Sequence, residues 1–346
     1  MILDEKAAEA GVTVRFFTRL IDVDRADGHI NGVVTHDVEG YKYVRAKTFV
    51  DATGDAVLSV LAGAEYFEAG RDSDGIMPPT VPALFANVDW TRDNTPTQTP
   101  GCVALIEKAY EAGDFEQCDR HLVGISRIGE TVGYLNGGHI FGASAVKVKD
   151  VSEAMATGRR IAQQNLRFLR GFSPACENME LVSISSILGV RESRRVKGAY
   201  ELNIADYMAR RQFPDQIAVF NKYVDTHPYD TDKQSYEKFI VEKHKYILNE
   251  GEFIGLPYGI LVPRGFDNLW VAGRCASADV MTAGSIRVMP AAAMMGQAAG
   301  TAAAQAAVTG ETASGLDTAR LVTTLRENGA YLPQQTLSKT LTKSEH

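Results

Sequence analysis

The sequence predicts an α/β fold in which two separate stretches of chain build one domain around an inserted mixed α+β domain. Two short apolar segments with parallel-strand character, residues 48–51 and 269–272, lie near opposite ends of the 346-residue chain. Each is followed by a glycine-containing turn and a helical pattern. Between them, residues 82–261 mix helices and strands without regular βα alternation.

The first stretch opens with a helical pattern over residues 1–10 that ends at Gly11, a plausible helix C-cap. Residues 12–17 alternate apolar and polar side chains, which predicts a strand. Asp-Gly and Glu-Gly turns then separate three more strands, which predicts an antiparallel meander. Those strands cover residues 21–25, 32–38 and 41–46, and a helix over residues 55–63 follows the parallel strand.

The inserted region contains three helical and three strand patterns. Helices are predicted over residues 103–112, 151–170 and 203–210, and strands over 130–135, 181–188 and 216–220. After the second parallel strand, a helix runs from Pro290 to residue 308 and Gly310 ends it. A last amphipathic helix covers residues 316–327.

These patterns divide the chain into a discontinuous domain, residues 1–81 and 262–332, and an inserted domain, residues 82–261, which we interpret as the substrate domain. Residues 333–346 are polar and predict a loose tail.

Composition excludes several classes of function. Hydrophobic residues make up 45% and charged residues 23% of the chain, which is ordinary for a globular protein. The net charge of −7 argues against a nucleic-acid or anionic-membrane partner. No apolar run reaches the length of a membrane-spanning helix. Charge in the first six residues argues against a signal peptide, so we expect a cytoplasmic location.

The four cysteines, Cys102, Cys118, Cys176 and Cys275, are scattered and form no C-x-x-C pair. The sequence therefore predicts no zinc or iron–sulfur site. Cys275 is interpreted as a small buried hydrophobic residue.

The C-terminal motif is the most informative segment. Residues 268–279 read N-L-W-V-A-G-R-C-A-S-A-D, residues 284–290 read G-S-I-R-V-M-P, and an Ala/Gly-rich stretch follows. A helix N-terminus offers free N–H groups and partial positive charge, so this pattern suits an anionic ligand. Gly296 and Gly300 are expected to let the helix pack closely on the sheet. An ordinary buried Ala/Gly helix is the alternative.

This motif closely resembles the C-terminal FAD segment of the FAD-dependent oxidoreductase family, within the glutathione-reductase/fumarate-reductase-like flavoprotein superfamily. Three further segments are similar to the family's patterns. They are V-D-A-T-G-D at residues 50–55 with A-G-A at 62–64, L-G-V-R-E-S-R-R at 188–195, and D-Q-I at 215–217 with Y-V-D-T-H at 223–227. The resemblance spans residues 7–332 and implies a Rossmann-like FAD/NAD(P)-binding domain with FAD as the cofactor.

One family feature is not found. Family members begin with a strand, a G-x-G-x-x-G turn and a helix, and the sequence contains no such motif. We therefore expect an incomplete Rossmann-like domain in which the first βαβ unit is missing.

The resemblance also implies a set of cofactor-binding residues. Thr53, Gly54 and Asp55 would approach the flavin or its linker. The ribityl and isoalloxazine side would be lined by Gly273, Arg274, Asp279, Ser285, Arg287 and Val288. Helix capping is the alternative role for Asp55 and Asp279.

The candidate catalytic residues lie in the inserted region. Arg191 and Glu192 would bind a carboxylate, phosphate or polyol, because arginine offers bidentate donors. His227 is a candidate acid/base, since imidazole titrates near neutrality. Tyr258 would face the flavin. A solvated salt-bridged turn is the alternative for the arginine cluster, and a structural role is the alternative for His227.

The sequence thus predicts an FAD-dependent oxidoreductase that oxidises a small polar substrate, a sugar or a hydroxy acid, by hydride transfer to flavin. The alternative is a truncated or split subunit, inactive alone, that needs a partner chain carrying G-x-G-x-x-G. An apo binding module for a polar ligand is a third reading. Exposed sheet surface also predicts association with a partner chain or a homo-oligomer.

Overall fold

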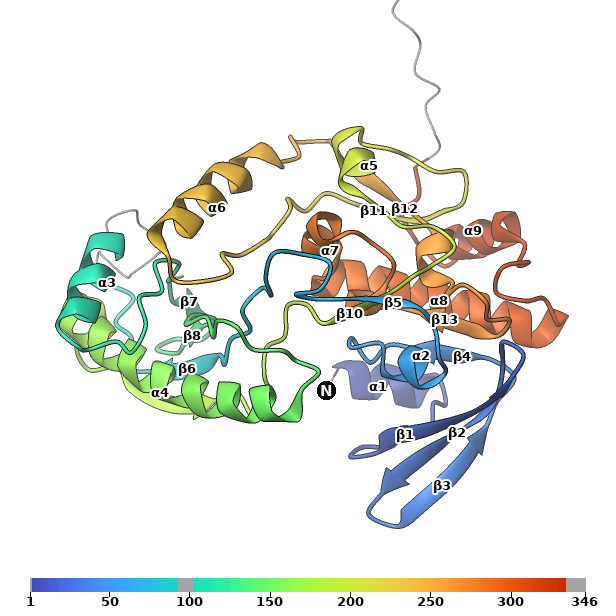
Figure 1. Ribbon diagram of the computed structural model, residues 1–346, viewed down its shortest axis with the longest axis horizontal. Coiled ribbons are helices and arrows are strands. Elements are labelled where there is room, and N and C mark those ends of the chain that lie inside the picture. Colours follow the sequence, from blue (N-terminus) through green and yellow to red (C-terminus); the bar gives the residue numbers. More distant parts are fainter. Residues whose placement is uncertain (1, 93–101, 123, 334–346) are drawn as a thin grey trace, which may run out of the picture.

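A computed structural model describes residues 2–92, 102–122 and 124–333. Figure 1 shows two lobes joined by several crossing segments, with the strand meander and the long helix α8 in one lobe and helices α3 and α4 in the other. The predicted tail, residues 333–346, lies outside the described residues except for its first residue.

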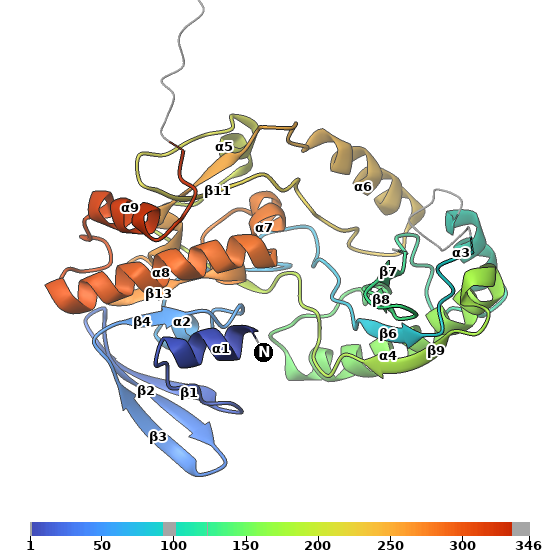
Figure 2. The same cartoon turned by 180° about the vertical axis from the view of Figure 1, so that it is seen from behind.

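The parallel sheet joins the two ends of the chain. Strand β4 (Phe49–Asp51) pairs in parallel with β13 (Leu269–Val271), with Phe49 opposite Leu269. All three residues of β13 are buried. Helix α8 (Met289–Thr309) runs alongside this sheet, as Figure 2 shows from behind. The predicted α/β class and the parallel character of both strands are confirmed.

The antiparallel meander extends from this sheet (Figure 1). Strands β1 (Arg19–Ala26), β2 (His29–Asp37) and β3 (Gly40–Arg45) pair in the order β1-β2-β3. Helices α1 (Ile2–Glu9) and α2 (Val57–Leu61) flank them. The strand predicted over residues 12–17 is wrong: these residues are all exposed and no neighbouring strand pairs with them, so their apolar side chains have no face to cover.

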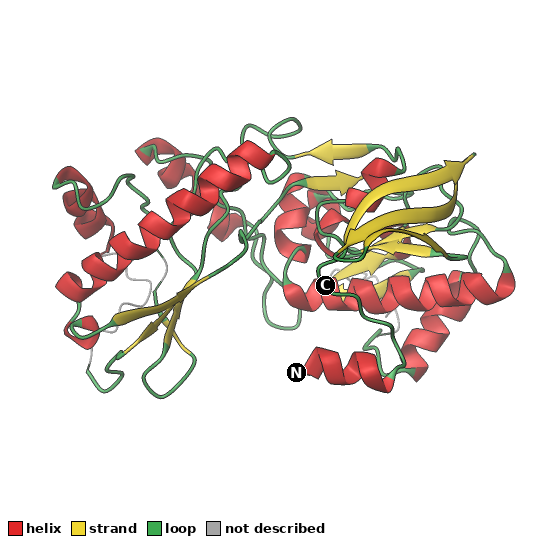
Figure 3. Cartoon of the chain, turned by 90° about the horizontal axis from the view of Figure 1, so that it is seen from below, coloured by secondary structure: helices red, strands yellow, loops and turns green. Residues whose placement is uncertain are grey.

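The second lobe is built on a four-stranded sheet of order β7-β8-β6-β9. Helix α4 (Val148–Phe172) lies against it (Figure 3). The face of α4 turned to the sheet buries Ile161, Ala162 and Leu169. The remaining elements of this lobe are α3 (Cys102–Glu111), β6 (Ala83–Ala86), β7 (Ser126–Arg127), β8 (Gly133–Leu135), η1 (Pro174–Cys176) and β9 (Glu180–Ile184).

The largest core cluster gathers residues between Leu202 and Leu332 around α8. It holds the pair β11 (Gln216–Phe220) and β12 (Ile254–Pro257), and α9 (Thr318–Glu327) packs beside α8. Short elements complete this region: β5 (Tyr66–Glu68), β10 (Arg194–Val196), α5 (Ile204–Met208), η2 (Tyr258–Leu261), η3 (Gly273–Cys275) and α7 (Val280–Ile286).

Helix α6 (Lys233–Lys245) was not expected from the sequence. It buries a single side chain, Phe239, so it carries almost no apolar periodicity. The carboxylate of Asp232 begins it by accepting hydrogen bonds from the backbone N–H groups of Gln234 and Ser235.

The expected close packing of Gly296 and Gly300 is wrong, because both glycines are exposed. The face that α8 buries consists of alanines and Met295 instead. The 3.6-residue period places the glycines on the opposite side. The outer face of α8 is therefore apolar and open, with Met289 85% and Val308 86% exposed.

Among the described residues, no helix combines the length and the hydropathy needed to cross a bilayer.

The buried amide of Asn268 ties the meander to the parallel sheet. It accepts a hydrogen bond from the Ile30 N–H and donates to the carbonyls of Ile30 and Lys47. Because Asn268→Ala leaves these buried groups unpaired, we expect the free energy of unfolding to fall by about 3 kcal/mol in urea denaturation. Asn31→Ala, which removes an exposed hydrogen bond to Asp24, is the matched control and should change it by less than about 0.5 kcal/mol.

Candidate active site

The first half of the site forms where β4 and β13 end. Asp51, the last residue of β4, fixes the following turn: its carboxylate accepts hydrogen bonds from the N–H and hydroxyl groups of Thr53 and of Ser59. Thr53 in turn accepts from the Val57 N–H at the start of α2. Gly54 adopts φ +76°, which a side chain would strain.

Asp55 and Arg274 meet across this edge. The Nη2 atom of Arg274 lies 2.5 Å from Oδ1 of Asp55, and the Ser193 hydroxyl donates to the same oxygen at 2.6 Å. A Cβ on Gly54 would lie 2.8 Å from Nη2 of Arg274, so the glycine makes room for the guanidinium. Asp55 therefore pairs with an arginine rather than capping α2, whose N-cap residue is Ala56.

Asp279 and Ser285 are occupied by structural contacts. The Asp279 carboxylate caps α7 by accepting from the Thr282 N–H, and its other oxygen accepts from the Ile204 N–H, both at 2.7 Å. The capping alternative is thus observed for Asp279. The buried Ser285 hydroxyl donates to the Lys222 carbonyl at 2.8 Å.

The N-terminus of α8 is open to an anionic group. Its N-cap residue, Val288, provides no side-chain hydrogen bond, and Pro290 has no N–H. The N–H groups of Met289 and Ala291 are therefore the donors that this helix end could offer to a ligand. Gly273, at φ +81°, precedes Arg274 at the end of β13. The Nε atoms of Arg274 and Arg287 are buried without a partner. These unpaired donors fit the phosphate and flavin edge of FAD.

A cavity of about 590 Å³ lies between the lobes and touches this helix end at Val288. Arg191, His227 and Arg287 line it together with Val288, so four predicted site residues share one space. Its other lining residues are His121, Gly124, Ile125, Ser126, Tyr134, Asn136, Tyr223, Asp225 and Lys243.

Positive charge dominates this cavity. Arg287 donates to the Asp225 carbonyl at 2.8 Å and approaches its carboxylate at 3.4 Å. Arg191 donates to the Pro78 carbonyl at 2.6 Å. Burial, together with the charge of Arg287, lowers the pKa of Arg191 to about 10, which leaves it protonated at neutral pH. Three cationic side chains, counting Lys243, therefore face the single carboxylate of Asp225.

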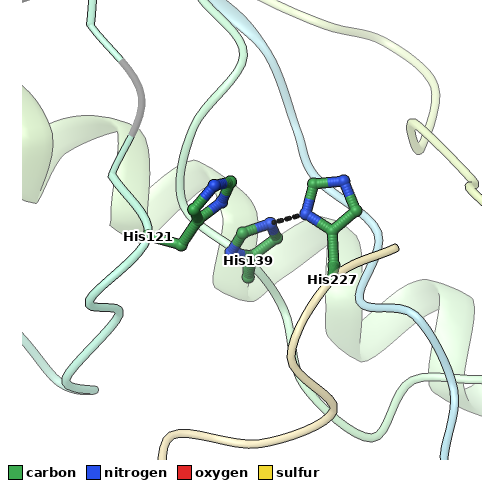
Figure 4. Close-up of side chains that lie close together, drawn as sticks. All are labelled: His121, His139 and His227. Carbon is green, nitrogen blue, oxygen red and sulfur yellow. Dashed lines mark hydrogen bonds between the residues drawn. The ribbon is translucent and has the colours of Figure 1, made fainter. Parts of the chain in front are cut away.

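A row of buried polar side chains stands behind His227 (Figure 4). Nδ1 of His227 lies 2.9 Å from Nε2 of His139, and Nδ1 of His139 lies 3.0 Å from Oδ1 of Asp119. His121 stacks on His139 with ring centroids 5.4 Å apart. Asp119 also accepts hydrogen bonds from the backbone N–H groups of His121 and His139.

Burial shapes the protonation of this row. Burial lowers the pKa of His121 to about 3 and that of His227 well below its usual value, and neighbouring cationic groups add to both effects. Burial alone would raise the pKa of Asp119, but the hydrogen bonds that it accepts from His139 hold it well below its usual range. Asp119 is therefore ionised, while His121 and His227 are neutral at neutral pH.

The same three imidazoles form the group of described residues best placed to hold a metal ion, with ligand atoms within 4.8 Å of one another. Both nitrogens of His139 are already hydrogen-bonded, one to Asp119 and one to His227. An ion bound by all three rings would have to break the contact between His139 and His227. The absence of a metal site therefore stays a prediction.

Two predicted catalytic residues do not line the cavity. One oxygen of Glu192 accepts the Met77 N–H, the other is buried without a partner, and burial raises the pKa of its carboxyl. Tyr258 lies in the main core, where its hydroxyl donates to the Ala313 carbonyl and accepts from the Trp270 indole, both at 2.7 Å.

Asp119, His121 and His139 were missed by sequence reasoning. They come from loops of the inserted region, and no spacing between them matches a known motif. Only the fold brings them beside His227. Asp225, in contrast, lies in the Y-V-D-T-H segment that the family resemblance had already indicated.

Paired parallel strands whose carboxyl ends meet an uncapped helix N-terminus, beside a polar cavity, are an arrangement found in dinucleotide-binding proteins. The model of the family described as FAD dependent oxidoreductase matches residues 1–325. The chain therefore belongs to the FAD-dependent oxidoreductase family, which confirms the predicted family, fold class and cofactor. A search of curated proteins finds no match.

Solved structures give more distant likenesses. The flavin-dependent halogenase CmlS has a TM-score of 0.43 at 12% identity, covering 94% of this chain and 42% of that one. A triple mutant of the flavin-dependent brominase Bmp2 has 0.39 at 13%, covering 94% and 58%. The aromatic hydroxylase CabE has 0.34 at 13%, covering 58% and 34%. The chain thus spans between 34% and 58% of the length of these proteins.

Acid should destabilise the fold through its buried imidazoles. The pKa of His121 is about 3 in the folded chain, against about 6.5 unfolded, so below pH 6.5 only the unfolded chain gains the proton. From pH 7 to pH 5, we expect His121 alone to lower the free energy of unfolding by about 2 kcal/mol. Buried His227 acts in the same direction.

Urea denaturation at both pH values measures this loss. Between pH 7 and pH 5, the free energy of unfolding should fall less in His121→Gln than in the unchanged protein. In His244→Gln, which changes an exposed histidine, it should fall as much as in the unchanged protein. If the unchanged protein and His121→Gln lose equal stability, the lowered pKa of His121 in the folded chain is contradicted.

Proposed function

We propose that this chain is an FAD-dependent oxidoreductase, or the greater part of one, that oxidises a small polar substrate by hydride transfer. The observation that carries the proposal is the position of Val288. This residue begins α8, whose N-terminus suits the anionic cofactor, and it also lines the cavity that contains Arg191 and His227. Cofactor and substrate would thus meet at one wall.

The residues proposed to hold FAD are those at the ends of β4 and β13 together with the start of α8. Gly54 and Gly273 let the backbone approach a ligand closely, and Arg274 offers an unpaired Nε–H. Arg287, just before α8, adds positive charge beside the helix N-terminus. When bound, FAD supplies the acceptor for a hydride.

The charge of the cavity favours a hydroxy acid over a neutral sugar. Arg191 and Arg287 are both buried guanidinium groups, and among the described residues Asp225 is the only carboxylate that lines the space. A substrate carboxylate between them would supply the missing negative charge and accept bidentate hydrogen bonds. The substrate's hydroxyl would then lie toward His227, which would accept its proton.

A second candidate is a subunit that needs a partner chain carrying the G-x-G-x-x-G unit. The open face of α8 favours it, because Met289, Gly296, Gly300 and Val308 are exposed there, with Gln297 as a polar neighbour. Strand β4 pairs with β13 alone among the described strands, so its other edge is unpaired. Such a partner would complete the cofactor site.

Flavin retention separates the two candidates. The purified chain is mixed with FAD, free flavin is removed, and absorption bands near about 370 and 450 nm are recorded, as for a protein-bound oxidised flavin. Retention by the chain alone supports the first candidate and contradicts the second. Arg274→Ala should weaken binding by about 10- to 100-fold, since it removes a charged donor. Arg92→Ala, at an exposed ion pair, is the control.

Substrate class is tested by anaerobic bleaching of the flavin-loaded protein with short 2-hydroxy acids and with neutral sugars. We expect the hydroxy acids to bleach it. Arg191→Met should raise the concentration needed for half-maximal bleaching by about 10- to 100-fold, because a charged hydrogen bond is lost. Bleaching by sugars with equal response in Arg191→Met would show that the cavity does not select a carboxylate.

A further inference from the structure

Asp119, His139 and His227 form a row joined by two hydrogen bonds, and the order of donors and acceptors along the row can be assigned. Its members come from three separate loops, and each is at most 9% exposed. Both contacts, at 3.0 and 2.9 Å, are of hydrogen-bond length and shielded from water. The row ends at His227, in the wall of the cavity.

The hydrogen positions follow from the carboxylate. Asp119 accepts from two backbone N–H groups as well as from the ring of His139, and an ionised carboxylate only accepts. Nδ1 of His139 therefore carries a hydrogen. In a neutral imidazole the other nitrogen is then an acceptor, so Nε2 of His139 receives the hydrogen on Nδ1 of His227. This leaves Nε2 of His227 without a hydrogen and with a free lone pair.

Among the described residues, none forms a hydrogen bond with this nitrogen. Oδ1 of Asp225 lies 3.9 Å from it. The charged and titratable groups around the cavity are Arg191, Arg287, Lys243, Asp225, His121, Tyr134 and Tyr223. The three cations oppose a positive charge on His227. Asp119 is the buried negative group that can offset that charge through His139.

We propose that Asp119 and His139 are positioning residues that lock His227 in its Nδ1–H form and so present Nε2 to the cavity as a proton acceptor. The use of that acceptor in catalysis rests on the proposed function. Nε2 of His227 would accept the proton of a substrate hydroxyl, and FAD, when bound, would supply the acceptor for the hydride from the adjacent carbon. Asp119 stays ionised and stabilises the imidazolium, as in other carboxylate–histidine pairs.

The tautomers can be observed directly, without cofactor or substrate. Nitrogen-15 NMR of the full chain labelled at its seven histidines distinguishes a ring nitrogen that carries hydrogen from one that does not. Loss of one signal set in His227→Asn assigns His227. We expect Nδ1 of His227 to carry hydrogen and Nε2 to lack it at neutral pH. An Nε2–H form, or rapid exchange between the two forms, would overturn the proposal.

The variant Asp119→Asn tests whether the carboxylate sets which nitrogens of His139 and His227 carry hydrogen. The amide of this variant can donate to Nδ1 of His139, which would move the hydrogen of His139 to Nε2 and that of His227 to its own Nε2. We therefore expect the two signals of His227 to exchange identity. Asp232→Asn, which changes a carboxylate that accepts two backbone N–H groups at the start of α6, is the matched control and should leave them unchanged. An unchanged His227 in folded Asp119→Asn would contradict the proposal.

Two further results keep this test separate from the proposed function. Metal analysis of the purified chain should find no ion held by His139 and His227. One bound ion per chain, together with loss of the Nδ1–H signal of His227, would contradict the proposed hydrogen bond between these histidines. Failure to retain flavin would count against the proposed function and leave the tautomer result intact. Once a bleaching substrate is known, Asp119→Asn should slow flavin reduction by about 10²- to 10⁴-fold, with little change in substrate affinity.

Discussion

The parallel pairing of β4 with β13 is the contact on which the candidate site depends. Each strand is only three residues long, yet together they join segments more than 200 positions apart. Because they run in the same direction, their carboxyl ends meet at one edge. That edge brings Asp55 against Arg274 and places the start of α8 beside both. Neither half of the chain contains this arrangement alone.

Charge balance is the second constraint. Asp55 is matched by Arg274 at the edge of the sheet, but in the cavity Arg191, Arg287 and Lys243 face one carboxylate. Buried cations without partners cost stability unless a ligand compensates them. The protein thus has an ion pair at the edge proposed to bind the cofactor and an excess of positive charge in the cavity proposed to bind the substrate.

Motifs indicated where two strands end because they combine turn chemistry with local polar residues. The D-A-T-G-D and A-G-R segments predicted the ends of two strands. Gly54 and Gly273 in these segments adopt the left-handed backbone expected of such turns. Local patterns failed where tertiary packing decides. The alternation of residues 12–17 finds no partner strand, and Gly296 and Gly300 face outward because the alanines of α8 fill the core.

The sequence by itself determined the family, the cofactor class, the order of most helices and strands, and the candidacy of Arg191 and His227, since these depend on short-range patterns. Only the tertiary structure decided which polar side chains meet. Asp119 lies 108 positions before His227, and His139 lies 88 positions before it. No sequence periodicity links these residues, yet His139 and His227 are in contact in the fold. Tyr258 likewise forms a hydrogen bond in the core and Asp279 caps a helix, because buried polar groups need hydrogen-bond partners.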